Sequence, residues 1–205
     1  MRKHRQKDRP QHQRSSVDVD VDSLLQVENV CAGCAPGQKC CCSSYTVCAT
    51  AAEVKRIIRA LPAAAVHCPH LPTTGVHDNL FVEEEPGLFT IAKAADGLCV
   101  FGYWSQGRTH CSLHTVAEEL GLPLEQVKPK VCLLWPLNFS DLDEVLAVIA
   151  DAPLFSCNVR KAPGSRSISP GFLDTIDRVY GEGCGAQVQL AAECGSRRTL
   201  LITRR

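Results

Sequence analysis

Hydrophobic and acidic residues alternate near the start of the chain, where residues 17–22 are Val-Asp-Val-Asp-Val-Asp. A period of two is typical of a β-strand with one buried face. The pattern therefore predicts an edge strand whose carboxylates face the solvent. The preceding residues, 1–16, are polar and basic, which is typical of a disordered tail, or alternatively of a weak contact with nucleic acid or a protein partner.

A helical period appears further along the chain. Apolar residues recur every three or four positions across residues 54–61. Residues 50–53 are Thr-Ala-Ala-Glu, which matches a capping box at the start of a helix. Pro62 is expected to end this helix, because proline cannot donate the next backbone hydrogen bond.

Shorter elements are predicted along the rest of the chain. They are strands at 79–83 and 88–93, a hairpin turn at Asp96-Gly97, a Gly-rich loop at 102–108, and helices at 115–120 and from Asp141 to Ala150. Pro170 and Gly181 suit the first residue and the cap of a later helix. A last strand is expected at 200–203.

The composition limits the class of protein. The chain is 45% hydrophobic, enough for a core, and its formal net charge is zero, which gives no general attraction to nucleic acid or anionic lipid. No apolar run reaches about 18 residues, so a membrane span is not expected. No apolar segment follows the basic N-terminus, so no secretory signal is expected either. A reducing cytoplasm is the predicted compartment.

The thirteen cysteines are bunched, and this is the feature that points to chemistry. The densest group comprises Cys31-Ala-Gly-Cys34, the consecutive residues Cys40, Cys41 and Cys42, and then Cys48. Neighbouring cysteines are poorly placed for disulfides, because a bridge between adjacent residues is strained. Thiolates are good metal ligands, and a C-x-x-C pair lets two sulfurs bind one ion from a tight turn. The group predicts a metal site.

Three further cysteines, Cys99, Cys111 and Cys132, are expected in loops or at strand ends, where they can converge on the same site. Cys157, Cys184 and Cys194 are spread thinly and are interpreted as inert thiols of the protein interior. The roles of Cys40 and Cys48 are left open. The group His67-Cys68-Pro69-His70 could supply zinc ligands, but a solvated loop is the favoured interpretation.

These motifs, taken together, resemble a known family. The order C-x-x-C, Cys-Cys, T-x-x-E, D-G-x-C-x-F, C-S-L-H and K-P-x-x-C-x-x-W-P is similar to the YkgJ-type cysteine-cluster proteins, described as zinc- or iron-chelating domains, and spans about residues 31–137. The resemblance implies seven metal ligands, which are Cys31, Cys34, Cys41, Cys42, Cys99, Cys111 and Cys132. The gap before the doublet is longer than in the family, and Leu133 stands where the family commonly has Arg.

Seven thiolates exceed the four that one tetrahedral ion accepts. Two ions or an iron–sulfur cluster would use the surplus, so the expected cofactor is an iron–sulfur cluster or Zn²⁺, with a slight preference for iron–sulfur because few histidines are placed as ligands. The predicted fold class is α+β: a small, irregular, metal-centred domain at 17–150, with short helices and hairpins, followed by a C-terminal α/β extension at 151–205 packed on it.

No catalytic motif is present: there is no G-x-G-x-x-G after a strand, no phosphate-binding loop and no H-E-x-x-H. Three functions remain open. The cluster can be chiefly structural or present an interaction surface to a protein partner, which is the favoured hypothesis. It can serve a redox or protein-modifying enzyme, as in the flagellin lysine methylases, which carry a similar cysteine cluster. It can also store or deliver metal, in which case Cys40, Cys48 and Cys68 would be spare ligands.

Overall fold

A computed structural model describes residues 16–31, 33–72, 77, 79–139 and 145–202. These residues form seven α-helices, two short 3₁₀ helices and eleven strands, arranged as several small sheets. The predicted α+β class is confirmed. The predicted tail lies outside the described residues, except that Ser16 begins the first strand.

The first strand of the chain lies inside a sheet. β1 (Ser16–Asp20) pairs antiparallel with β11 (Arg198–Ile202) on one side and meets β9 (Leu146–Val148) on the other, and β8 (Leu137–Phe139) completes the order β11-β1-β9-β8. Val17 and Val19 are buried whereas Asp18 is exposed, as the alternation predicts. The expectation of an edge strand is wrong, because both edges of β1 have partners.

Three helices pack with this sheet around one core. They are α1 (Val21–Leu25), α6 (Pro170–Tyr180) and α7 (Cys184–Glu193), and they bury Leu24, Phe172 and Val188 almost completely. The predicted start of α6 at Pro170 and its cap at Gly181 are confirmed. We call this the terminal core, because it combines residues 17–27 with residues 134–201.

A second core, which we call the central core, lies within residues 49–127. Its main helix is α3 (Ala51–His67), which packs on α4 (Ser112–Glu119). The capping box is present, since Thr50 Oγ1 accepts from Glu53 N and the Glu53 carboxylate accepts from Thr50 N. Pro62 does not end the helix as predicted. Leu61, Ala64 and Ala65 are buried on either side of it, and this packing holds the last turns in place.

Two small sheets complete the central core. β3 (Cys48–Thr50), β5 (Leu88–Ile91) and β4 (Phe81–Glu85) form one of them, so the predicted strands at 79–83 and 88–93 are confirmed. β6 (Gly102–Ser105) and β7 (Arg108–Cys111) form a hairpin where a loop was expected. Its two-residue turn has positive φ at Gln106 and Gly107, the geometry that joins antiparallel strands most tightly.

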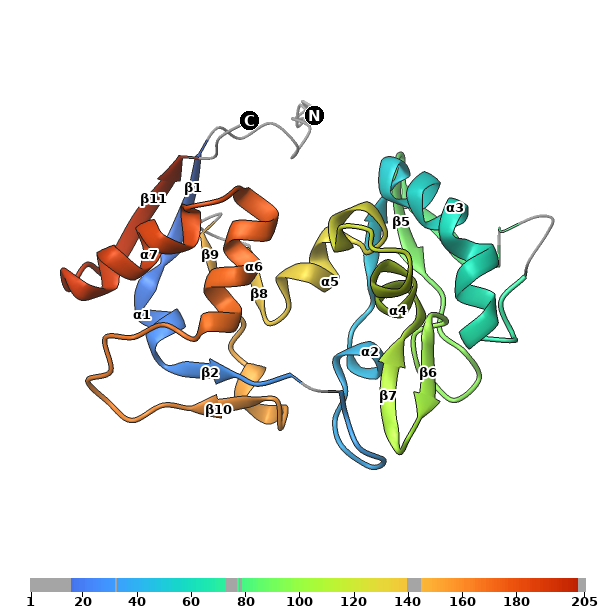
Figure 1. Ribbon diagram of the computed structural model, residues 1–205, viewed down its shortest axis with the longest axis horizontal. Coiled ribbons are helices and arrows are strands. Elements are labelled where there is room, and N and C mark those ends of the chain that lie inside the picture. Colours follow the sequence, from blue (N-terminus) through green and yellow to red (C-terminus); the bar gives the residue numbers. More distant parts are fainter. Residues whose placement is uncertain (1–15, 32, 73–76, 78, 140–144, 203–205) are drawn as a thin grey trace, which may run out of the picture.

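The two cores are joined by α5 (Lys130–Leu134), which lies between them in Figure 1. The 3₁₀ helix η1 (Leu124–Gln126) precedes it. Glu53 fixes α5 on α3, because its Oε1 accepts a 2.8 Å hydrogen bond from Lys130 N. The helix predicted from Asp141 to Ala150 is wrong where the structure describes this segment: residues 146–148 are strand β9, while 140–144 lie outside the described residues.

A short two-stranded ribbon extends from the terminal core toward the first cysteines. β2 (Val27–Asn29) pairs antiparallel with β10 (Asn158–Arg160), and the 3₁₀ helix η2 (Ala152–Leu154) precedes β10. In Figure 1 the chain leaves β2 and crosses to the central core. Among the described residues, no helix has the length and apolar character that crossing a bilayer requires.

Candidate metal centre

Three consecutive cysteines bring their sulfur atoms together. Cys40 is extended (φ −117°, ψ 136°) and precedes the short helix α2 (Cys41–Ser44), so the chain turns sharply at this point. The sulfur atoms of Cys40, Cys41 and Cys42 all lie within 4.8 Å of one another, and Cys41 Sγ is 3.9 Å from Cys42 Sγ. Four thiolates 2.3 Å from a tetrahedral zinc ion lie about 3.8 Å apart. This triad, Cys40–Cys42, can hold a metal ion.

Cys34 lies against the triad. Cys34, Cys40 and Leu98 are buried together, and Cys42 packs on them. The position of Cys34 is set by the backbone, because its carbonyl oxygen accepts a 2.9 Å hydrogen bond from Thr109 N on β7. Burial, together with the neighbouring Cys40, raises the pKa of Cys34 to about 12. Cys34 is therefore a neutral thiol beside the triad in the metal-free protein.

The triad itself favours a thiolate at Cys40. Hydrogen bonds from the side chains of Cys41 and Cys42 lower the pKa of Cys40 to about 2. The same hydrogen bond to Cys40 raises the pKa of Cys41 to about 12, and that of Cys42 is raised as well. One negative sulfur held by two thiol donors is a ready starting point for binding a cation.

Cys99, Cys111 and Cys132 come from three other elements of the fold. Cys99 follows the predicted turn at Asp96-Gly97, and Cys111 is the last residue of β7. Cys132 lies on α5. Burial raises the pKa of Cys132, and negative charge on Cys111 and Cys99 raises it further. The three thiols are therefore close enough to repel one another when ionised, as expected for neighbouring metal ligands.

Lys128 contributes a positive charge to the same region. Burial alone would lower the pKa of this lysine, but Cys111, Cys132, Cys42 and Cys41 raise it above its usual value. Lys128 therefore interacts electrostatically with cysteines of the triad and with Cys111 and Cys132.

Cys157 was interpreted from the sequence as an inert thiol of the interior, and it is buried. Its carbonyl oxygen accepts a 2.8 Å hydrogen bond from the backbone N–H of Val30, the residue before Cys31. Interaction with the Cys157 thiol lowers the pKa of Cys31 to about 6, and the same interaction raises the pKa of Cys157. Cys31 in turn interacts electrostatically with Cys40. No local sequence signal marks Cys157, because only the pairing of β2 with β10 brings it to the site.

The remaining cysteines and histidines have other partners. The sulfur of Cys68 is buried and lies 3.7 Å from the carbonyl oxygen of Gly102. Cys184 Sγ lies 3.6 Å from Tyr180 O in the terminal core. His67 pairs with Glu119 at 3.0 Å, and His70 Nε2 lies 2.7 Å from Val100 O. The described contacts of His67-Cys68-Pro69-His70 are thus with protein groups.

The structure brings some of the predicted metal ligands close together but not others. All thirteen cysteines are thiols rather than disulfides. Among the described residues, only the triad forms a set of three or more ligand atoms within 4.8 Å of one another. It contains the predicted Cys41 and Cys42 together with Cys40, whose role was left open. Of the other predicted ligands, Cys34 packs on the triad and Cys99 N donates to Cys42 O. Cys31, Cys111 and Cys132 do not belong to this set of close sulfur atoms.

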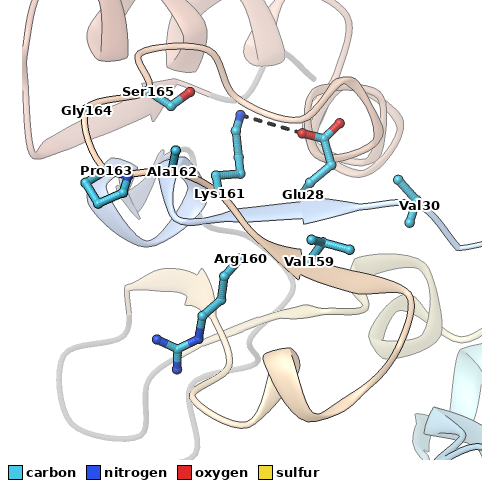
Figure 2. A pocket seen from close by; sticks show the side chains of 9 residues that line it. All are labelled: Glu28, Val30, Val159, Arg160, Lys161, Ala162, Pro163, Gly164 and Ser165. Carbon is cyan, nitrogen blue, oxygen red and sulfur yellow. Dashed lines mark ion pairs between the residues drawn. The ribbon is translucent and has the colours of Figure 1, made fainter.

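An open pocket lies beside the β2–β10 ribbon, away from the triad. Figure 2 shows its lining, which comprises Glu28, Val30, Val159, Arg160, Lys161, Ala162, Pro163, Gly164 and Ser165. Lys161 Nζ pairs with Glu28 Oε2 at 3.8 Å and donates to Ser167 O, while Arg160 points away from this pair. The lining holds no cysteine and no histidine, so it offers no soft metal ligand.

The chain was compared with known proteins at three levels. No family model matches it, and neither the curated proteins nor the solved structures give a significant match. The cysteine site is therefore interpreted from its own geometry.

Proposed function

We propose that this protein binds a thiophilic metal ion through Cys40, Cys41 and Cys42, with Cys34 as the fourth thiolate. The observation that carries the proposal is the set of three sulfur atoms within 4.8 Å of one another. Cys34 supports it, because its side chain is buried together with that of Cys40 and lies against Cys42. Four sulfurs around one ion form the usual closed coordination of a structural site.

The spacing of the triad favours zinc. The 3.9 Å between Cys41 Sγ and Cys42 Sγ is close to the separation of about 3.8 Å expected for thiolates that share one tetrahedral ion. In a 4Fe–4S cluster each protein thiolate binds a different iron, so the thiolates lie further apart. An iron–sulfur cluster remains the second candidate for Cys99, Cys111 and Cys132, because these thiols are more widely spread and lie beside the cation of Lys128.

The family membership expected from the motifs is part of the proposal. A YkgJ-type cysteine-cluster protein would use these same cysteines to chelate zinc or iron. A chiefly structural metal is supported by the origin of the ligands, since the candidate cysteines come from α2, β7, α5 and the connecting turns. An ion bound to several elements adds its binding free energy to the stability of the folded chain.

Metal analysis of the full-length protein, purified without oxygen under reducing conditions, tests the proposal. We expect a colourless protein with at least one zinc per chain and a large loss of thermal stability on chelation. A brown protein with stoichiometric iron would favour the cluster and overturn the zinc assignment. A protein that is fully folded without metal and fails to bind added zinc or iron would overturn metal binding altogether.

A redox or protein-modifying enzyme and a metal carrier are the alternative functions. A carrier would lose its metal to mild chelators and stay folded, whereas a structural site would not. An enzyme would need an open coordination position on the metal, which binding of azide to the cobalt(II)-substituted protein would report as a change in its visible spectrum. An unchanged spectrum with azide, combined with unfolding on metal removal, supports the structural role.

A further inference from the structure

The β2–β10 ribbon leads both of its strands to the cysteine site. Asn29 lies opposite Asn158, and the ladder continues with a 2.8 Å hydrogen bond from Val30 N to Cys157 O. Cys31 is the next residue after Val30. Two cysteines far apart in the sequence therefore lie at the same end of one ribbon. The ribbon is connected to the terminal core through Val27 of β2, which is buried there.

Aromatic rings pack together beside this end of the β2–β10 ribbon. Tyr45, which follows the triad, has its ring centroid 5.1 Å from that of Trp135 and 5.6 Å from that of Phe155. The Tyr45 hydroxyl donates a 2.5 Å hydrogen bond to Asp151 Oδ2. These contacts fix the triad segment against residues 151–157, since packed rings have narrowly defined orientations.

A charged contact supports the same arrangement. Lys39, directly before the triad, places its Nζ 4.6 Å from the Phe155 ring centroid and 3.9 Å from Asp151 Oδ2. The ion pair is about half-exposed and contributes little by itself. Together with the aromatic contacts, this ion pair keeps residues 39–45 and 151–157 side by side. These contacts place the segment that contains Cys157 next to the triad.

The buried indole of Trp135 also points to a ligand role for Cys157. Its Nε1 is buried and has no hydrogen-bond partner among the described residues. The ring centroid of Trp135 lies 4.8 Å from that of Phe155, two residues before Cys157. A buried N–H of this kind would stabilise the negative charge of a nearby metal-bound thiolate.

We propose that Cys31 and Cys157 bind a second ion of the metal centre, which shares a triad thiolate with the ion held by Cys34 and the triad, and that this second ion fastens the terminal core to the central core. This inference rests on the proposed metal binding and adds a second ion and a role to it. The second ion would join strand ends of the β2–β10 ribbon to the triad segment. The two cores would then unfold together when metal is bound and separately when it is removed.

Zinc titration and calorimetry of the full-length, reduced protein test the proposal with Cys157→Ser. The matched control is Cys184→Ser, which removes another buried thiol of the C-terminal part, away from the triad. We expect Cys157→Ser to weaken binding of the second zinc ion at least about tenfold, because losing a residue that only hydrogen-bonds to a metal ligand already costs about tenfold or more in metal affinity. We expect a single unfolding transition for the zinc-loaded wild type and two for zinc-loaded Cys157→Ser. Cys184→Ser should keep the wild-type affinity and the single transition.

Unfolding of the metal-free proteins distinguishes a metal ligand from a residue that only packs in the interior. If Cys157 acts through the ion, metal-free Cys157→Ser and metal-free wild type unfold alike. Equal destabilisation with and without zinc would overturn the proposal, as would unchanged affinity for the second zinc ion or a wild type that binds only one. If Cys157→Ser does not fold, Cys31→Ser decides in its place, because Cys31 is exposed and its replacement leaves no cavity. A wild type that binds no zinc would instead overturn the proposed function itself.

Discussion

The backbone N–H of Cys99 donates a 2.8 Å hydrogen bond to the carbonyl oxygen of Cys42. Two cysteine-bearing segments are thus aligned by main-chain atoms, which no side-chain substitution removes. Cys42→Ser and Cys99→Ser should therefore keep the metal-free fold and lower the metal content. Circular dichroism of the metal-free variants and metal analysis after loading check this. Cys194→Ser, at an exposed position, is the control, and an equal metal loss there would contradict the assignment.

Metal binding should release protons, so the apparent affinity should rise with pH. Burial raises the pKa of Cys34 to about 12, and the hydrogen bond to Cys40 raises that of Cys41 to about 12, so both are protonated at neutral pH. Each must lose its proton to bind a metal, which gives about a tenfold gain in affinity per pH unit for each proton released. Cys40, with its pKa lowered to about 2, adds no such dependence.

Competition with a chelator of known affinity at several pH values between 6 and 8 measures this slope. A pH indicator in weak buffer counts the released protons directly. A slope of zero, with no protons released, would mean that these thiols are already ionised or do not bind the metal.

Lys128→Met should weaken metal binding without removing a ligand. The ammonium group interacts electrostatically with Cys41, Cys42, Cys111 and Cys132 and offsets their negative charge when they are ionised. Its loss leaves the thiolates to repel one another, and about 1 kcal/mol of charge interaction corresponds to a several-fold drop in affinity. Zinc titration of Lys128→Met and Lys128→Arg checks the role of charge, since the arginine variant should keep most of the affinity.

Glu53 should matter for stability even in the metal-free protein. Its carboxylate accepts hydrogen bonds from the backbone N–H groups of Thr50 and Lys130, both at 2.8 Å, and so joins the start of α3 to the start of α5. Glu53→Ala should lower the free energy of unfolding by about 2–4 kcal/mol, because a cap is lost and a second N–H loses its partner. Urea unfolding with and without metal measures the change. An effect seen only with metal bound would contradict this role.

Two glycines allow the site and the terminal core to be disturbed separately. A Cβ at Gly102 would lie 2.5 Å from Leu98 Cδ2 and 3.0 Å from Cys99 O, so Gly102→Ala should displace Cys99 and reduce metal affinity. A Cβ at Gly185 would lie 2.7 Å from Leu173 O, where α7 packs on α6. Gly185→Ala should lower thermal stability yet leave metal affinity within about threefold of wild type at low temperature. An equal loss of metal affinity in Gly102→Ala and Gly185→Ala would show that metal binding depends on the packing of the terminal core as well as on the residues near the cysteines.

Local signals in the sequence predicted local structure well. The capping box at Thr50 and Glu53 gave the start of α3, and Pro170 and Gly181 gave the limits of α6, because caps and φ preferences act within a few residues. Predictions failed where tertiary contacts outweighed such preferences. Pro62 lies inside α3 because its neighbours are buried in the central core.

The site was predictable only in part for the same reason. The run of cysteines indicated a metal, and Cys41 and Cys42 lie in the triad. The approach of Cys157 depends on the pairing of β2 with β10, and that of Lys128 on the contacts of η1 with α4 and α5, neither of which leaves a local pattern. The choice between Cys40 and its neighbours depended on spacing alone, whereas the turn before α2 brings all three sulfurs to one side.

The pairing of β1 with β11 fixes an order of events during synthesis. Because β1 finds its antiparallel partner only at residues 198–202, the sheet it belongs to cannot be completed before these residues have left the ribosome. The segment from Cys31 to Cys132 emerges earlier and contains its own core. Nascent chains stalled before β11 should therefore already take up metal, and the outer part of the molecule should assemble around a loaded centre.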